Sequence, residues 1–487
     1  MSRRITIDPV TRLEGHGKVE VILDERGDVA EAWLQVPELR GFERFCLGRP
    51  AVEMPRITAH VCGVCPAAHH IASARALDAV YRVEPPESAH RIRELYYDLF
   101  LFEDHALHFY YLGGPDVVLG TRAEPARRNV FGVMDKLGRD LGRRVVEARK
   151  LARDLMGSIA GRAAHPVFAL PGGVSRPLGP DQVARLREVA PKLVDFAAFT
   201  LDAFAGGALR SSEYLEMLSR PAFRLDHHSM GLVDAEGRLA FYRGTARVVD
   251  PAGREKLRFG PESYLEHIAE HVEPWTYVKF PYLRSHGWRG FEEGPESGLY
   301  RVGPLARLNA AERMASPRAE AEAQRMFAAL GKPAHQTLAF HWARLVEALQ
   351  AAEEVERLAH HPDLLDPDVR RLPAEKPTEG VGMVEAPRGT LLHHYRTDER
   401  GLLTMVNLVV ASQHNAGPVQ ISIRKAAREV IHGGQVDEGA LNVLETAFRA
   451  YDPCNACASH SLPGEMPMEV TLRGPDGEVR NILARGT

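Results

Sequence analysis

Two short stretches dominate the interpretation of this sequence: RITAHVCGVCP at residues 56–66 and DPCNACASH at residues 452–460. Each contains a Cys-x-x-Cys pair, and the two pairs hold four of the five cysteines in the chain. Four thiolates that meet in space form a soft site that selects a transition metal. The sequence therefore predicts that its two ends converge on one metal site near the centre of the fold.

Length, composition and charge restrict the class of protein and its partners only broadly. A chain of 487 residues with 45% hydrophobic and 26% charged residues is typical of a globular protein with a large core. Its net charge of −4 indicates neither a nucleic-acid partner nor an anionic membrane. Five cysteines are too few for a disulfide scaffold and suit a reducing compartment. Without a transmembrane stretch or a signal peptide, a cytoplasmic location is expected.

Hydrophobic periodicity predicts a mainly α fold with peripheral β structure, an α+β class. Residues 5–36 alternate in polarity and predict strands, and a long helix capped by Ser88 is expected next. Helical spacing continues over residues 123–162, 181–219, 317–360 and 437–451, whereas residues 229–260 indicate short strands and residues 380–425 strand and loop. With no repeat or linker, one large domain over residues 1–460 is the simplest organisation, with a β-rich part at 1–60 and a helical core with β insertions at 61–460.

Spacing alone leaves the nature of the metal open. A structural tetrahedral zinc site is one interpretation of two Cys-x-x-Cys pairs, and an iron–sulfur cluster is another. Zinc modules usually keep their pairs within some tens of residues, because the metal organises a small unit. Here the pairs flank nearly the whole fold, which is unusual for such a module.

The residues around the cysteines resemble the large, catalytic subunit of nickel–iron hydrogenases. The blocks that carry this resemblance are DPVTRLEGH at 8–16, RGFE at 40–43, CGVCPAAH at 62–69, EAPRG at 385–389 and DPCNACASH at 452–460. Three further segments, CPAAHH at 65–70, KFPY at 279–282 and YRVGPLARLN at 300–309, are similar to the cytoplasmic branch that does not reduce a deazaflavin and is linked to NAD or to a heterodisulfide reductase. The family fold is related to the quinone-site subunit of respiratory complex I.

The resemblance implies a role for each cysteine of the two pairs. Cys62 and Cys454 would be terminal ligands of nickel, and Cys65 and Cys457 would bridge nickel to iron. The iron would carry two cyanides and one carbon monoxide. The local base would be either a Cys454 thiolate next to the metals or Arg388.

A magnesium ion is also implied near the C-terminal cysteines. Glu43 and His460 match its two side-chain ligands, and a backbone carbonyl near Leu408 would contribute. Carboxylate oxygen suits magnesium, whereas histidine is a less usual ligand. The alternative for Glu43 is an ordinary surface ion pair, worth ~0–1 kcal/mol.

Glu14 matches the family glutamate that passes protons between a nickel thiolate and the exterior. A carboxyl group performs this well where burial raises its pKa toward neutrality. The alternative is a solvated carboxylate at the end of a strand.

Four further residues match the surroundings of the metals. Arg388, which follows Pro387, would lie above the open metal position, and Asp116 would orient it. Ser412 falls where a hydroxyl donates to a cyanide, and His69 matches a histidine that hydrogen-bonds a bridging thiolate. For Arg388 the alternative is an ordinary arginine at the rim of the core.

We therefore expect reversible heterolytic cleavage of dihydrogen into protons and electrons. Only Cys46 remains beyond the four site cysteines, so this chain cannot ligate an iron–sulfur relay of its own and needs an iron–sulfur small subunit. Further electron-transfer subunits and a maturation protease are implied, because related enzymes lose a tail such as residues 461–487, which indicates a small hairpin here. The alternatives are a non-catalytic scaffold like that of complex I and a zinc-stapled structural protein.

Overall fold

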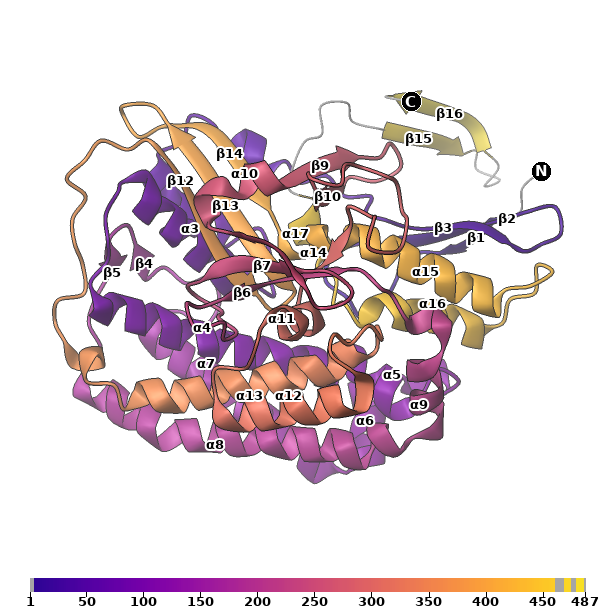
Figure 1. The fold of residues 1–487 in the computed structure, drawn as a ribbon, viewed down its shortest axis with the longest axis horizontal. Coiled ribbons are helices and arrows are strands. Elements are labelled where there is room, and N and C mark those ends of the chain that lie inside the picture. Colours follow the sequence, from indigo (N-terminus) through magenta and orange to yellow (C-terminus); the bar gives the residue numbers. More distant parts are fainter. Residues whose placement is uncertain (1–3, 460–467, 474–478, 486–487) are drawn as a thin grey trace.

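A layer of long helices forms one side of the molecule (Figure 1). The fold comes from a computed structural model that describes residues 4–459, 468–473 and 479–485. The long helices are α4 (Glu87–Leu107), α7 (Arg139–Ala160), α8 (Pro180–Gly206), α12 (Pro317–Leu330) and α13 (Ala339–Ala359). Helix α13 packs along α4, α8 and α12, and α7 packs along α4 and α8. About half of the chain is helical, as the periodicity predicts.

The burial of the side chains in α7 and α13 matches the position of each helix in this layer. In α7 the buried side chains recur every three or four residues, as at Leu141, Val145, Ala148 and Ala152. Its arginines lie mostly on the opposite, outer face, which is the pattern of an amphipathic helix at a surface. Helix α13 is buried on almost all sides, because other helices cover it.

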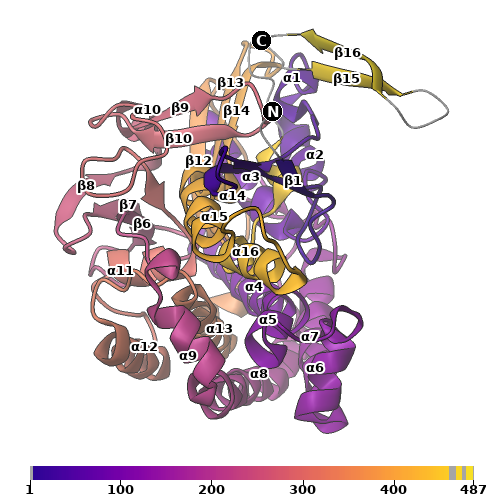
Figure 2. The same cartoon turned by 90° about the vertical axis from the view of Figure 1, so that its right-hand side faces the viewer.

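Several small sheets lie above and beside the helices (Figures 1 and 2). The described strands are β1 (Arg4–Ile7), β2 (Lys18–Leu23), β3 (Val29–Gln35), β4 (Ala169–Leu170), β5 (Gly173–Val174), β6 (His228–Val233), β7 (Thr245–Val249), β8 (Glu255–Phe259), β9 (Ile268–Val272), β10 (Lys279–Leu283), β11 (Tyr300–Arg301), β12 (Glu379–Ala386), β13 (Gly389–Thr397), β14 (Leu403–Val409), β15 (Met468–Arg473) and β16 (Val479–Arg485). They pair in the orders β1-β2-β3, β11-β6-β7-β8, β12-β13-β14, β9-β10, β4-β5 and β15-β16. Among these described strands, all neighbours are antiparallel except β11 and β6.

The remaining helices connect these parts. They are α1 (Phe42–Phe45), α2 (Met54–Thr58), α3 (Pro66–Val80), α5 (Gly114–Leu119), α6 (Val130–Leu137), α9 (Ser212–Ser219), α10 (Tyr264–His267), α11 (Pro304–Ala310), α14 (Ala411–His414), α15 (Ala416–Val430), α16 (Glu438–Arg449) and α17 (Asn455–Ala458), with a π-helical turn at His108–Gly113. Helix α15 packs against β3 and α16, so segments from both ends of the chain lie side by side. No helix among the described residues has an apolar stretch long enough to cross a membrane.

Two glycines let helix α3 approach the β12–β13 sheet closely. A Cβ atom added at Gly382 would overlap the Ala72 carbonyl oxygen, and one added at Gly380 would overlap the Val80 nitrogen. These glycines are two residues apart and share one face of β12, so only residues without a side chain permit this contact. The middle and the end of α3 are thereby held against the sheet that carries Arg388 in the β12–β13 connection.

Two local predictions are wrong. Helix α4 begins at Glu87 with Pro86 at its cap position, and the Ser88 hydroxyl donates to the carbonyl of Asp368. Residues 411–425, the last part of the range 380–425 expected to be strand and loop, fall in α14 and α15. The sequence Val419-Gln-Ile-Ser-Ile423 alternates like a strand, but it is buried on almost every side, and tertiary packing overrides such a local preference. The hairpin predicted in the tail is confirmed for the described strands β15 and β16.

Candidate metal centre

The two cysteine pairs sit at the starts of two helices. Cys65 caps α3, and Pro66 follows in the first turn, where its missing N–H costs nothing. Cys454 caps the short helix α17, which places Cys457 one turn later. The backbone N–H groups of Val64 and Cys65 donate to the Cys62 sulfur at 3.2 Å each, which holds the first loop in a ligand-presenting shape.

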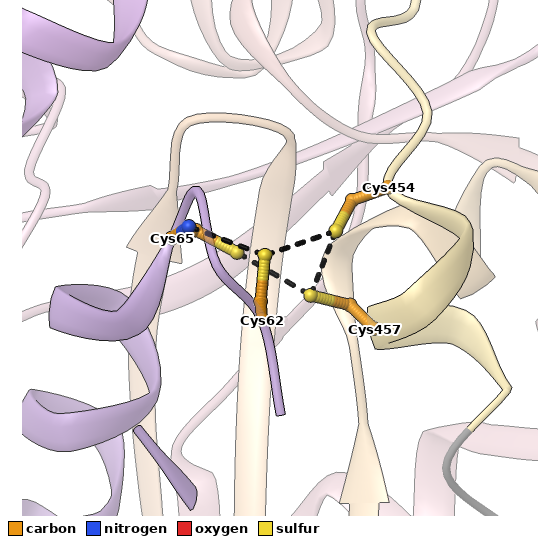
Figure 3. A group of neighbouring side chains, drawn as sticks. All are labelled: Cys62, Cys65, Cys454 and Cys457. Atoms are coloured by element: carbon orange, nitrogen blue, oxygen red, sulfur yellow. Dashed lines mark hydrogen bonds between the residues drawn. The ribbon is translucent and has the colours of Figure 1, made fainter. Parts of the chain in front are cut away.

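The four sulfur atoms converge, as predicted. Sγ–Sγ distances are 3.4 Å for Cys62–Cys454, 3.3 Å for Cys65–Cys457 and 2.8 Å for Cys454–Cys457. All four lie within 4.8 Å of one another and all four residues are buried. Figure 3 shows the four cysteine side chains, from the loop before α3 and from the start of α17, pointing toward one another.

These thiols are suited to a metal. Burial raises the pKa of Cys454 and that of Cys457 well above the ordinary thiol value, so both keep their protons until a metal displaces them. At Cys62 burial acts in the same direction, but hydrogen bonds from Cys454 and Cys457 outweigh it and lower the pKa. Four soft donors so close together in a buried site fit a nickel–iron pair and would equally ligate another soft metal.

Glu14 lies directly against the site. Its Oε2 atom is 2.9 Å from Cys454 Sγ and accepts a hydrogen bond from the Ala456 N–H at 3.3 Å. The backbone secures the contact, because the Asn455 N–H donates to the Glu14 carbonyl at 2.9 Å. Burial raises the pKa of Glu14, and the charge at Cys62 adds to this effect.

Arg388 points into the buried region beside the cysteines, and two carboxylates hold it. Its Nη1 atom is 3.2 Å from Asp104 Oδ2, and its Nη2 atom is 3.0 Å from Asp452 Oδ2. Burial opposes the charge on Arg388, but Asp104 and Asp452 raise its pKa well above the ordinary value. The guanidinium therefore stays charged although it is almost fully buried.

The prediction that Asp116 orients Arg388 is wrong. Asp116 instead accepts from three other arginines, Arg12, Arg128 and Arg449, at 2.5 to 2.6 Å. Asp116 lies beyond the π-helical turn at 108–113, so it faces a different part of the core from Asp104 on α4. Its cluster ties the loop before Glu14 to helix α16, which leads into the second cysteine pair.

His69 and Ser412 each contact one of the C-terminal cysteines. The His69 Nε2 atom is 3.4 Å from Cys457 Sγ, and the Ser412 hydroxyl accepts from the Cys454 N–H at 2.8 Å. Both residues, with Arg388, line a cavity of about 10 Å³ beside the cysteines. Pro387 is fixed through its carbonyl, which accepts from Arg307 at 3.1 Å.

The residues predicted for magnesium are partly described. Glu43 is half-buried on α1, and its Oε1 atom accepts from the Leu408 N–H at 2.7 Å. Leu408 is buried on β14, so this carboxylate and the strand backbone are neighbours. His460 lies outside the described residues.

Sequence reasoning missed several residues of this region. Asp104, Asp452 and His393 contact the predicted site residues, and Arg307 fixes the backbone before Arg388. Asp104 is one of three buried acids of α4, with Asp98 and Glu103, so the sequence pattern did not single it out. For the other residues the decisive contacts arise only from packing.

Comparisons with known proteins agree with this geometry. A family model described as nickel-dependent hydrogenase matches residues 40–130 and 239–460, and a second model, HoxL-like, matches residues 4–39. The chain belongs to the nickel-dependent hydrogenase family. It is a catalytic large subunit of this family with a four-cysteine nickel–iron site. This family assignment replaces the two alternatives, a zinc-stapled structural protein and a non-catalytic scaffold.

Individual relatives cover almost the whole chain. It is 44% identical over 98% of both chains to a protein of Archaeoglobus profundus that is named as an iron–sulfur subunit of an F420-non-reducing hydrogenase. It is 37% identical over the full length of both chains to the NAD-reducing hydrogenase HoxS subunit beta of Cupriavidus necator. A crystal structure of an NAD⁺-reducing NiFe hydrogenase superposes with a TM-score of 0.88 at 38% identity, covering 94% of this chain and 99% of that one.

Proposed function

We propose that this hydrogenase subunit cleaves dihydrogen heterolytically and reversibly, and that it passes the electrons to an iron–sulfur partner subunit. The observation that carries this proposal is the group of four buried thiols within 4.8 Å, with the carboxyl group of Glu14 2.9 Å from one of them. A soft metal site and a neighbouring proton acceptor are the two parts that heterolytic cleavage needs.

The ligand roles follow the pairing of the cysteines. Cys62 and Cys454 are proposed as the terminal ligands of nickel, and Cys65 and Cys457 as the bridges to an iron that carries two cyanides and one carbon monoxide. When bound, this centre would supply Lewis-acid polarisation of dihydrogen and accept its electrons. The chemistry of the donor set supports the assignment, because four thiolates suit soft metals.

A proton would leave the site through Glu14. Its Oε2 atom is in hydrogen-bond range of Cys454 Sγ, so a proton on that sulfur has an acceptor without any movement of the backbone. Glu14 is only partly buried, so a proton on its carboxyl group can pass outward. Glu14 is thus the proposed first member of the exit path.

Arg388 would complete the site from the opposite side. Its charge lies in a buried region where an oriented cation acts strongly on a bound group. Asp104 and Asp452 hold the guanidinium in place, so its position does not depend on the ligand. Ser412 is proposed to contact a cyanide and His69 to tune the Cys457 sulfur.

The electrons would leave through another protein. Beyond the four site cysteines the sequence contains only Cys46, which is buried in the core and lies outside the four-cysteine cluster. A relay of iron–sulfur clusters therefore has to come from a partner protein. The similarity to one relative named F420-non-reducing and another named NAD-reducing favours an enzyme that uses no deazaflavin. A cytoplasmic complex linked to NAD or to a heterodisulfide reductase is the proposed setting.

A magnesium site and processing of the tail complete the proposal. Glu43, with the backbone near Leu408 and with His460, is proposed to hold one magnesium ion, since the Glu43 carboxylate lies 2.7 Å from the Leu408 nitrogen. Residues 461–487 are proposed to be removed after His460 by a maturation protease. Intact mass of the matured subunit tests the processing, and a loss of bound magnesium in Glu43→Gln tests the site.

Infrared spectroscopy and elemental analysis of the matured complex test the central claim. We expect bands of metal-bound cyanide and carbon monoxide, with about one nickel per complex and iron in excess of nickel, because the partner's iron–sulfur clusters add iron. Zinc in place of nickel, without these bands, would indicate a structural staple, and a complex with neither nickel nor zinc would indicate a scaffold like that of complex I. Either result would refute the proposed activity.

A further inference from the structure

A buried chain of hydrogen bonds runs from Cys457 into the β12–β13–β14 sheet. It joins Cys457 Sγ to His69 Nε2 at 3.4 Å, and His69 Nδ1 to His393 Nε2 at 3.0 Å. It continues from His393 Nδ1 to Tyr395 Oη at 2.6 Å and from Tyr395 Oη to Ser73 Oγ at 3.0 Å. Cys457 and His69 are predicted site residues, whereas His393, Tyr395 and Ser73 have no assigned role.

Helix α3 and strand β13 supply the four residues that follow Cys457 in this series of hydrogen bonds. His69 and Ser73 are four residues apart on α3 and share one face of that helix. His393 and Tyr395 are two residues apart on β13 and share one face of the sheet. All four residues are at most 1% exposed, so water cannot replace any of these partners.

Both ring nitrogens of His69 and of His393 have hydrogen-bond partners. Some other buried histidines in the described part of the protein lack them. His69 and His393 each use both nitrogens in the chain. Within the described part of the protein, the buried histidines His227 and His228 have no hydrogen-bond partner at any of their four ring nitrogens. Packing alone therefore does not require such a complete arrangement.

Once Cys457 ligates a metal as a thiolate, the donor and the acceptor of each bond in this series of hydrogen bonds are fixed. The sulfur then only accepts, so His69 Nε2 has to carry the proton and His69 Nδ1 has to accept. His393 Nε2 must donate to it, and His393 Nδ1 must accept from the Tyr395 hydroxyl. The Tyr395 oxygen must then accept from the Ser73 hydroxyl, because a phenol has a single proton to donate.

We propose that His393 and Tyr395 are positioning residues that orient His69 and polarise its N–H toward the Cys457 sulfur. A donor at this sulfur withdraws electron density that the thiolate would otherwise give to the metals. Successive hydrogen bonds strengthen one another in a region of low dielectric constant, so the outer members act on the sulfur through His69. This inference rests on the proposed nickel–iron centre.

Four variants of the matured complex test the proposal, with the carbon monoxide band on iron as the readout. His393→Leu breaks the chain next to His69 and should shift the band to lower wavenumber, because the sulfur becomes more electron-rich. Tyr395→Phe removes only the outer donor and should give a smaller shift in the same direction. His393→Gln should restore the wild-type position, since its amide donates to His69 Nδ1 and accepts from Tyr395.

The control is Tyr110→Phe, which removes another buried hydroxyl pair, Tyr110 Oη to Thr200 Oγ1 at 2.9 Å, in the helical layer. It should leave the band in place. An unshifted band in both His393→Leu and Tyr395→Phe would overturn the inference, and so would failure of Tyr395→Phe to load metal while Tyr110→Phe loads normally. Absence of the band in the wild-type complex would instead refute the proposed centre itself.

Discussion

Arg388 and Asp104 form an ion pair in the interior, with 3.2 Å between Nη1 and Oδ2 and side-chain exposures of 2% and 0%. The pair joins the β12–β13 connection to helix α4. Because neither side chain is exposed to water, Asp104 depends on Arg388, and Arg388 depends on both Asp104 and Asp452. The position of the guanidinium beside the cysteines is thus a property of the folded core and not of a flexible side chain.

Breaking this pair should cost both stability and activity. Asp104→Ala leaves the Arg388 charge with one partner fewer, and we expect a loss of about 3–5 kcal/mol in the free energy of unfolding. Arg388→Lys keeps the charge but loses the second donor arm, and turnover should fall roughly a hundredfold or more while the metals remain bound. Arg396→Lys, at an exposed pair with Glu379, is the matched control. Normal turnover in Arg388→Lys would remove this arginine from the mechanism.

Glu14→Gln should separate metal binding from proton transfer. The amide occupies the same space next to Cys454 but no longer accepts and releases a proton. We expect unchanged nickel content and infrared bands, with isotope exchange between dihydrogen and water reduced by about 10²–10⁴-fold. Glu31→Gln, at the exposed pair with Arg424, should exchange at the wild-type rate. If Glu14→Gln exchanges as fast as the wild type, protons leave by another route.

The cysteines offer an internal control for metal content. Cys457→Ser replaces a soft ligand and should abolish or strongly reduce nickel in the purified complex and lower its iron content to that of the partner's clusters. Cys46→Ser changes the fifth cysteine, which is equally buried but lies outside the cluster, and should keep both metals. Elemental analysis of the two variants checks this. Retention of both metals in Cys457→Ser would contradict the ligand assignment.

The ion pairs of Asp116 should stabilise the fold only while its carboxyl group is charged, so this stabilisation should be lost at low pH. Burial would raise the pKa of Asp116, but Arg449, Arg12 and Arg128 outweigh it and hold the pKa at about 2. Because the folded pKa lies below the unfolded value of ~4, the contribution of about 2 kcal/mol is complete above pH ~4 and disappears as the pH falls toward 2.

Thermal unfolding of Asp116→Asn measured between pH 2 and pH 6 tests this. The variant should be less stable than the wild type at pH 6, and the difference should shrink below pH ~4. Asp135→Asn, at an exposed position on α6, provides the comparison. A stability difference that stays constant across this pH range would show that the Asp116 ion pairs are not its source.

The residue types and order of the ligands could be read from the sequence. A Cys-x-x-Cys pair places two thiols one helical turn or loop apart by local geometry alone, and the flanking blocks placed Glu14, Arg388 and His69 near them. Long helices such as α7 and α13 also follow from local periodicity. These features depend on neighbours in the chain, so no tertiary information is needed to find them.

Only the tertiary structure decided which partners meet across the core. Asp104 and Asp116 are both acids of one helical stretch, yet the π-helical turn at 108–113 shifts the phase between them, so Asp104 faces Arg388 and Asp116 faces three other arginines. The link from His69 to His393 likewise exists because Gly380 and Gly382 let α3 settle onto the sheet. A buried charge or imidazole is stable only where packing delivers its partner, and the register of that packing is set by the whole fold.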